Sequence, residues 1–450
     1  MAEYGLIILG GGPAGYRAAE IAAKKMRTLL IEKADMGGVC LNSGCIPSKT
    51  FLQAAKVADY AAHAARYGAR ASDSAIDHAA VVARKTKVVR TLTAGVRASV
   101  KSAGAETVKA AGYIEGIENG RIAVSAAGDK HYADNLLIAC GSEAVVLPIK
   151  GIEEARLAGR VVTNAEIFSL KELPSSLVII GGGVVGAETA SYFASAGSKV
   201  TVIEATPRLL GSVDRDVAEV ITKALTRKGV RFLTSSTVTE ITPDGVICSG
   251  AENGFIEGDK ILLSAGRRAV TEGYGLENLG VATTRAGITT DKSMRTNVKG
   301  VYAAGDVNGK SMLAHTAYRE AEAAVNDMLG IPDEVNYDAV PSVIYTSPEG
   351  ASVGITAETE DVRYATVKIP AAYSGRYVAE CDERDGFLKL IADRERGILA
   401  GAHAALPYAG EIITAATALI SLKTPLDEAK KIVFPHPTVA ELMKTALDAL

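Results

Sequence analysis

The sequence predicts an α/β protein that holds two Rossmann-like βαβ units and ends in a separate α+β unit. Three observations support this fold class. A buried strand, a glycine-rich turn and an alanine-rich helix follow one another at residues 6–25, and the same order returns from residue 177. From about residue 339 the glycine patterns stop, and alternating strands followed by helices take their place. The length of 450 residues allows roughly three domains.

Composition limits the partners that this chain can have. With 49 Lys and Arg against 52 Asp and Glu, the net charge of −3 gives no reason to expect nucleic acid or an anionic membrane. No apolar run reaches the ~18 residues of a membrane-spanning helix, and the N-terminus lacks the pattern of a secretory signal. We therefore expect a cytoplasmic protein without nucleic-acid or membrane partners.

The first βαβ unit has the fingerprint of a dinucleotide-binding fold. Residues 6–9 read as a buried strand, Gly10, Gly12 and Gly15 follow it, and Glu32 ends the next strand. In this fingerprint the first glycine makes the turn, the second lets the backbone approach a pyrophosphate, and the third lets helix and strand pack closely. The phosphates bind at the helix N-terminus, and the acidic residue accepts hydrogen bonds from a ribose. The unit predicts a bound dinucleotide with Glu32 on its ribose.

The second unit repeats this fingerprint. Residues 177–180 form the strand, Gly181, Gly183 and Gly186 follow it, and Glu204 ends the next strand. Two such units in one chain predict two dinucleotides rather than one. A carboxylate at Glu204 would bond the 2′-hydroxyl of NAD and repel the 2′-phosphate of NADP, so the second dinucleotide is expected to be NAD.

A cysteine pair lies between the two units. Cys40 and Cys45 are two of five cysteines in the chain, and Lys49 follows them closely. A straight helix would separate the pair by about 7.5 Å, more than the roughly 4.4–6.8 Å between Cα atoms that a disulfide tolerates. The backbone must bend if the two are bonded, and residues 42–44 would allow it. The pattern predicts a working dithiol/disulfide pair in a reducing compartment.

Three residues are candidates for thiolate and proton-transfer chemistry. Cys45 stands at a probable helix start with Lys49 four residues on, so its thiolate should be the easier one to hold. His436 lies between two prolines, and Glu441 follows on the last helix. A histidine can take a proton from a thiol, and a carboxylate behind it supports the cation; the alternative is a structural histidine. No two histidines have ligand spacing, so a metal site is a poor interpretation.

The motifs, in this order, resemble the class I pyridine nucleotide-disulphide oxidoreductases, and among them the enzymes that oxidise dihydrolipoamide. The resemblance runs from Gly10 to Glu441. It rests on the first glycine fingerprint with Tyr16, Cys-Leu-Asn-Ser-Gly-Cys-Ile-Pro-Ser-Lys at 40–49, Gly-Gly-Gly-Val-Val-Gly-Ala-Glu at 181–188, Ala-Gly-Arg-Arg at 265–268, Ala-Gly-Asp at 304–306, Met-Leu-Ala-His at 312–315 and His-Pro-Thr-Val-Ala-Glu at 436–441.

This resemblance implies a domain order and a dimer. Residues 1–144 would be the first part of an FAD-binding domain with the redox disulfide, and residues 145–270 an NAD-binding domain. Residues 271–338 would complete the FAD-binding, central domain, and residues 339–450 would form an α+β interface (dimerisation) domain. The expected assembly is a homodimer.

It also implies the cofactor contacts. FAD would have Glu32 on its adenosine ribose and Asp306 on its ribityl chain, and Lys49 would lie near the flavin ring, paired with Glu188. The other residues expected to line FAD are Gly10, Gly12, Gly15, Gly112, Gly141, Ser142, Met312, Leu313, Ala314 and His315. His315 reads as a packing and backbone-positioning residue rather than an acid or base. The residues expected to hold NAD are Gly181, Gly183, Gly186, Glu188, Glu204, Val238 and Gly266.

The implied reaction is the oxidation of protein-bound dihydrolipoamide to lipoamide with NAD⁺. Cys40 would be the interchange thiol that faces the substrate, and Cys45 would be the thiol against the flavin. His436, supported by Glu441, would act as the base in the active site of the partner subunit. The expected partner is the lipoyl-bearing protein of a 2-oxoacid dehydrogenase or glycine cleavage complex.

Several other functions were weighed. A related NAD(P)H-dependent, glutathione-reductase-like disulfide reductase is the nearest, but it needs NADP, which Glu204 disfavours. Mercuric reductase calls for a C-terminal cysteine pair, which residues 437–450 lack, and soluble transhydrogenases lack the redox pair. A non-catalytic docking flavoprotein of a multi-enzyme complex would not need Cys40, Cys45 and His436 together.

Overall fold

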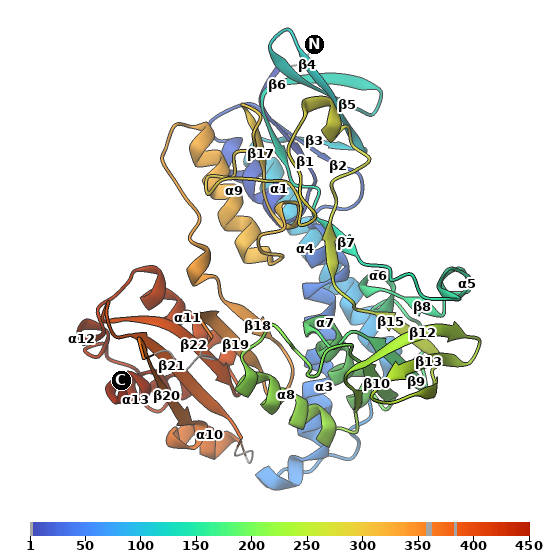
Figure 1. Cartoon of the computed structure of the whole chain (residues 1–450), viewed down its shortest axis with the longest axis vertical. Coiled ribbons are helices and arrows are strands. Elements are labelled where there is room, and N and C mark those ends of the chain that lie inside the picture. Colours follow the sequence, from blue (N-terminus) through green and yellow to red (C-terminus); the bar gives the residue numbers. More distant parts are fainter. Residues whose placement is uncertain (1–2, 357–361, 382–384) are drawn as a thin grey trace.

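The first sheet carries the first glycine fingerprint. The computed structural model describes residues 3–356, 362–381 and 385–450, and in these residues it forms five sheets (Figure 1). The first sheet has the order β3-β2-β1-β6-β5-β4, and β17 also pairs with β6. Leu6, Ile7 and Ile8 are fully buried, as expected for a central strand covered on both faces. Its strands are β1 (Glu3–Leu9), β2 (Thr28–Glu32), β3 (Glu106–Lys109), β4 (Gly112–Glu118), β5 (Arg121–Ala126), β6 (Asp129–Ile138) and β17 (Val301–Ala303).

Five helices belong to this part of the chain. Small residues let α1 and α9 pack closely on the sheet, with Ala18 and Ala19 buried against Ala321 and Ala324. Helix α3 runs between α4 and the second unit, where Phe51 joins the core of that unit. Residues 40–49, called the redox stretch below because they contain Cys40 and Cys45, are thereby held between the two units. These helices are α1 (Pro13–Ala22), α2 (Gly38–Ser43), α3 (Cys45–Ala62), α4 (His78–Ser102) and α9 (Ala314–Met328).

The second unit is a five-stranded parallel sheet in the order β11-β10-β9-β15-β8. A three-stranded antiparallel sheet, β12-β13-β14, lies beside it, and the pair β7–β16 joins the first two units. Its elements are β7 (Ser142–Ala144), α5 (Ile152–Leu157), β8 (Val161–Val162), α6 (Asn164–Ile167), β9 (Ser176–Ile180), α7 (Val184–Ser195), β10 (Lys199–Ile203), α8 (Arg215–Arg227), β11 (Arg231–Leu233), β12 (Ser236–Thr242), β13 (Gly245–Gly250), β14 (Gly254–Glu257), β15 (Lys260–Leu263) and β16 (Arg267–Ala269).

The C-terminal unit is an antiparallel sheet in the order β18-β19-β22-β21-β20, with helices α11 and α13 in its core (Figure 1). The predicted fold class, two Rossmann-like units and a C-terminal α+β unit, is confirmed. In the described residues no helix is both long and apolar enough to cross a membrane. The elements of this unit are β18 (Ser342–Ile344), β19 (Gly350–Gly354), β20 (Tyr364–Pro370), α10 (Gly375–Glu380), β21 (Phe387–Asp393), β22 (Ile398–Ala405), α11 (Ala409–Ser421), α12 (Leu426–Ala429) and α13 (Leu442–Ala449).

Candidate active site

The backbone bends between the two cysteines, as their spacing requires for a disulfide. Helix α2 carries Cys40 and ends at Ser43, and Cys45 is the first residue of α3. Gly44 between them has φ −133° and ψ −107°, which breaks the helix. A Cβ at this glycine would lie 3.0 Å from the carbonyl oxygen of Val39, so a side chain there would be crowded. Both cysteines are free thiols in this structure, and a hydrogen bond joins them.

The surroundings of the pair favour a thiolate on Cys45. The hydrogen bond from the Cys40 thiol, helped by the Lys49 ammonium, lowers the pKa of Cys45 to about 7 although burial opposes the shift. The same hydrogen bond, together with burial, raises the pKa of Cys40 far above its usual range. The first thiol to ionise is therefore Cys45, and its thiolate fraction falls as the pH drops through about 7.

Lys49 and Glu188 form the ion pair that the resemblance implied. Lys49 Nζ lies 2.9 Å from Glu188 Oε2 and 3.1 Å from Oε1, and the Glu188 side chain is only 6% exposed. The backbone N–H of Tyr345 also donates to Glu188 Oε1, at 2.9 Å. One turn of α3 separates Lys49 from Cys45, which keeps this cation near the thiol.

The two fingerprint acids make the same contacts in the two units. Glu32 accepts hydrogen bonds from the N–H groups of Gly11 and Ala34, at 2.5 and 2.6 Å. Glu204 accepts from the N–H groups of Gly182 and Thr206, both at 2.7 Å. Each carboxylate is thus fixed beside its glycine turn, where a dinucleotide ribose would bind.

The glycines of the fingerprints have separate structural reasons. A Cβ at Gly15 would lie 1.8 Å from the carbonyl oxygen of Gly10, and one at Gly186 would lie 2.2 Å from that of Gly181, so these two glycines serve the close packing of helix and turn. In contrast, a Cβ at Gly183 would meet nothing within 4 Å, and one at Gly12 would meet only the Cα of Gly38, at 3.8 Å. No side chain covers the backbone at these positions beside the helix N-terminus, so a pyrophosphate could approach it closely.

The other residues expected around FAD lie in a polar cluster, at two glycines and at the start of α9. Ser142 donates a hydrogen bond to Asp306, and Arg267 Nε donates to Ser142 Oγ at 2.8 Å, so these three form one polar cluster. Gly141 has φ +74° and open space around it, while a Cβ at Gly112 would collide with Leu9 at 2.5 Å. Met312 and Leu313 precede α9, and Ala314 and His315 begin it. His315 Nε2 contacts the carbonyl oxygen of Pro341 at 2.7 Å.

A cavity of about 510 Å³ opens at the second glycine turn. This volume is in the usual range for a small-molecule site. Gly186 packs inside the unit and Glu188 turns toward Lys49, so neither lines the cavity. Of the residues expected to hold NAD, those that line it are Gly181, Gly183, Glu204, Val238 and Gly266.

His436 and Glu441 form a pair at the surface of the C-terminal unit. His436 Nδ1 donates to Glu441 Oε2 at 2.7 Å, and the histidine side chain is 79% exposed. This bond fixes the tautomer and leaves Nε2 to accept a proton. Among the described residues, no hydrogen bond or ion pair joins this histidine to Cys40 or Cys45.

Sequence reasoning missed two residues of the site. Tyr345 contacts both members of the Lys49–Glu188 pair, since its ring centroid lies 4.2 Å from Lys49 Nζ. Arg267 is half-buried in the polar cluster with Ser142 and lines the cavity of the second unit. The Ala-Gly-Arg-Arg motif contains Arg267, but only Gly266 of that motif was expected to bind a cofactor, and no motif included Tyr345.

Comparison with known proteins covers nearly the whole chain. The model of the family described as pyridine nucleotide-disulphide oxidoreductase matches residues 4–321, and the model of its dimerisation domain matches residues 340–447. A dihydrolipoyl dehydrogenase of Mycoplasma genitalium is 36% identical over 98% of this chain and 97% of its own. The mitochondrial dihydrolipoyl dehydrogenase of Pisum sativum is 35% identical over 99% and 91% of the two chains.

Solved structures agree with this result. LpdA from Mycobacterium tuberculosis has a TM-score of 0.90 and 26% identity, with 100% of this chain and 99% of that chain covered. The HOCl-induced flavoprotein disulfide reductase RclA from Escherichia coli has a TM-score of 0.86 and 27% identity, with 99% of both chains covered.

Proposed function

Because the chain belongs to the pyridine nucleotide-disulphide oxidoreductase family, we propose that it oxidises protein-bound dihydrolipoamide to lipoamide with NAD⁺, using FAD. The observation that carries this proposal is the cysteine pair at the junction of α2 and α3, with Lys49 one turn after Cys45 and paired with Glu188. The glycine turn at Gly12 and the carboxylate of Glu32 fit FAD, and the cavity at Gly183 and Glu204 fits NAD.

The chain's own residues supply the thiol chemistry. A substrate thiol gives its proton to Nε2 of His436 of the partner subunit, and the thiolate attacks Cys40 Sγ of the oxidised pair. The Cys40–Cys45 bond breaks, and Cys45 leaves as the stabilised thiolate. The second substrate thiol then attacks the mixed disulfide, which closes the lipoyl disulfide and releases Cys40. His436 of the partner subunit gives the first proton to the leaving Cys40 sulfur and takes the proton of the second substrate thiol. When bound at the glycine turn of Gly12 and at Glu32, FAD would supply the two-electron redox chemistry that links the reduced cysteine pair to NAD⁺.

The remaining roles follow from this reaction. We propose that residues 1–144 and 271–338 bind FAD, that residues 145–270 bind NAD, and that residues 339–450 form the interface of a homodimer. Asp306 and Ser142 would hold the ribityl chain, and Glu188 would orient Lys49. The partner would be a lipoyl-bearing protein of a 2-oxoacid dehydrogenase or glycine cleavage complex, in a reducing cytoplasm.

The direct test is NADH formation from dihydrolipoamide. We expect turnover with NAD⁺ to be much faster than with NADP⁺, because Glu204 repels a 2′-phosphate. The same preparation should reduce glutathione disulfide with NADPH slowly or not at all. Faster turnover with glutathione disulfide and NADPH would overturn the proposal in favour of a glutathione-type reductase.

Replacing Glu204 should lower kcat/KM for NAD⁺ and reduce the selectivity for NAD⁺ over NADP⁺. In Glu204→Gln the charged acceptor is lost, and a hydrogen bond to a charged group contributes about 1.5–3 kcal/mol, so kcat/KM for NAD⁺ should fall about 10–100-fold. The preference for NAD⁺ over NADP⁺ should narrow, because the repelling charge is gone. Steady-state kinetics with both dinucleotides measure the two effects.

Glu240→Gln is the matched control for this variant. Glu240 lies on β12 of the same unit, pairs with Lys150 at 3.0 Å and does not line the cavity. It should keep the wild-type kcat/KM and preference. An unchanged preference in Glu204→Gln would remove Glu204 from the proposed NAD site.

A further inference from the structure

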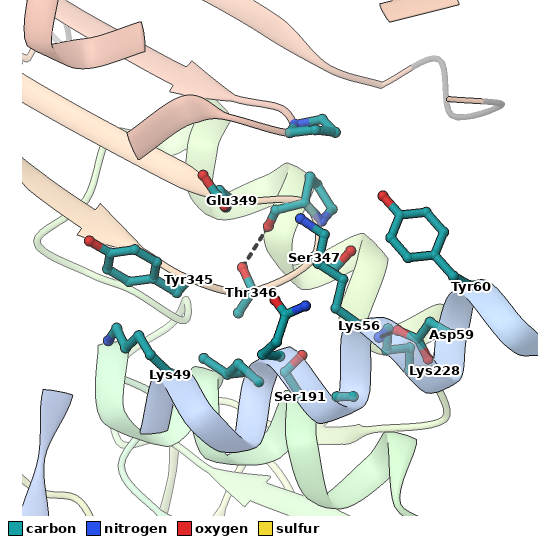
Figure 2. Close-up of a pocket in the computed structure, with 15 residues that line it drawn as sticks. Lys49, Lys56, Asp59, Tyr60, Ser191, Lys228, Tyr345, Thr346, Ser347 and Glu349 are labelled. Carbon is teal, nitrogen blue, oxygen red and sulfur yellow. Dashed lines mark hydrogen bonds and ion pairs between the residues drawn. The ribbon is translucent and has the colours of Figure 1, made fainter. Parts of the chain in front are cut away.

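Tyr345 joins the C-terminal unit to the ion pair beside the thiols. It follows β18, while Lys49 lies on α3 and Glu188 on α7, so the three residues come from three different units. Its backbone N–H donates to Glu188 Oε1 at 2.9 Å, and its ring centroid lies 4.2 Å from Lys49 Nζ. Figure 2 shows the ring standing over the end of the Lys49 side chain.

The Lys49 ammonium could also lie in a neighbouring pocket, away from Glu188. A pocket of about 170 Å³ begins at Lys49 and Tyr345 and extends along α3 to Tyr60 (Figure 2). The Lys49 side chain is 33% exposed, so water competes with Glu188 for its ammonium. The ring of Tyr345 lies over the ammonium, 4.2 Å from Nζ to the ring centroid, and attracts the cation through its quadrupole. The backbone N–H meanwhile fixes the carboxylate that Lys49 must meet.

We propose that Tyr345 is a positioning residue that holds Lys49 against Glu188 and thereby keeps the ammonium beside Cys45. The proposal rests on the proposed role of Cys45 as the thiol that is held as a thiolate. It makes the redox centre depend on a contact from the C-terminal unit, in addition to the base that this unit supplies.

The electrostatic consequence has a definite sign. Lys49 lowers the pKa of Cys45 and Glu188 raises it. If the ammonium moves into the pocket, the Glu188 carboxylate stays near Cys45 without the positive charge that offsets it. Loss of the ring should therefore raise the pKa of Cys45. The titratable and charged groups that face Cys45 are Cys40, Lys49, Glu188, Arg267, Tyr318 and Tyr345.

The test is the pH dependence of Cys45 alkylation in the reduced holoenzyme. Iodoacetamide is added between about pH 5 and 9.5, and modification at Cys45 is read by mass spectrometry of its peptide, in a Cys40→Ser background that keeps a hydroxyl donor and prevents the disulfide. In Tyr345→Leu and Tyr345→Met the midpoint should move up by about half a unit to one unit relative to the background protein. Tyr345→Phe should keep the background midpoint, because the ring and the N–H both remain.

Tyr60→Leu is the matched control. It removes an aromatic ring from the other end of the same pocket, as Figure 2 shows, and it should leave the midpoint unchanged. An unshifted midpoint in folded Tyr345→Leu and Tyr345→Met, or an equal shift in Tyr345→Phe, would overturn the proposal. Alkylation needs no turnover, so a wild-type enzyme that failed to oxidise dihydrolipoamide would refute the proposed function and leave this measurement interpretable.

Discussion

A Cys45→Ser enzyme should form NADH from dihydrolipoamide at about one thousandth of the wild-type rate or less. Without the second sulfur, Cys40 has no disulfide for the substrate thiolate to attack and no thiolate leaving group to release. A serine hydroxyl cannot take over, since its oxygen forms no stable bond to Cys40. The measurement is the initial rate of absorbance increase at the wavelength of NADH, with saturating dihydrolipoamide and NAD⁺.

Two controls separate lost chemistry from lost structure. Cys248→Ala replaces a buried cysteine on β13 that is 2% exposed and lies outside the redox stretch, and it should keep the wild-type rate. Cys45→Ser should also keep its oxidation of NADH by ferricyanide, because that reaction bypasses the thiols. A Cys45→Ser enzyme that oxidises dihydrolipoamide at the normal rate would refute the disulfide mechanism.

The sequence was most informative where a local pattern fixes local geometry. A bonded pair of cysteines with this spacing requires a bend, and the structure has one at Gly44 with both thiols free. The roles of Gly10 and Gly15 could be read in the same way, because a tight turn and a close helix–strand contact depend on neighbouring residues. The repeated fingerprint likewise has equivalent geometry in the two units, since Glu32 and Glu204 each accept a hydrogen bond from an N–H of their glycine turn.

Local sequence patterns could not predict the contacts between units. Tyr345 reaches Glu188 across a sequence separation of 157 residues, and that meeting is set by how the C-terminal unit packs against α7. The Lys49–Glu188 pair spans 139 residues and came only from the resemblance to a known family. No local rule links such residues, because their approach depends on the packing of whole sheets and helices.

His436→Gln should lower dihydrolipoamide oxidation about 10²–10⁴-fold, the usual contribution of a positioned general base. Nδ1 of this histidine is held by Glu441 at 2.7 Å, so Nε2 alone is available for the substrate proton. The oxidation of NADH by ferricyanide should stay at the wild-type rate, since it needs no proton transfer at the thiols. Parallel assays of both reactions on one preparation measure the difference, and an equal loss in both would point to misfolding.

Mixed dimers decide whether this histidine acts within its own chain or across the interface. In a hybrid of a Cys45→Ser chain and a His436→Gln chain, one active site combines an intact cysteine pair with an intact histidine only if the base comes from the partner subunit. Hybrids purified through two different tags should then recover about half of the wild-type activity, since one of two equivalent sites is complete. If the base acted within its own chain, both sites would be incomplete and the hybrid would be as inactive as its parents. The 79% exposure of His436 on a single chain, with no bond to either thiol in the described residues, favours the first outcome.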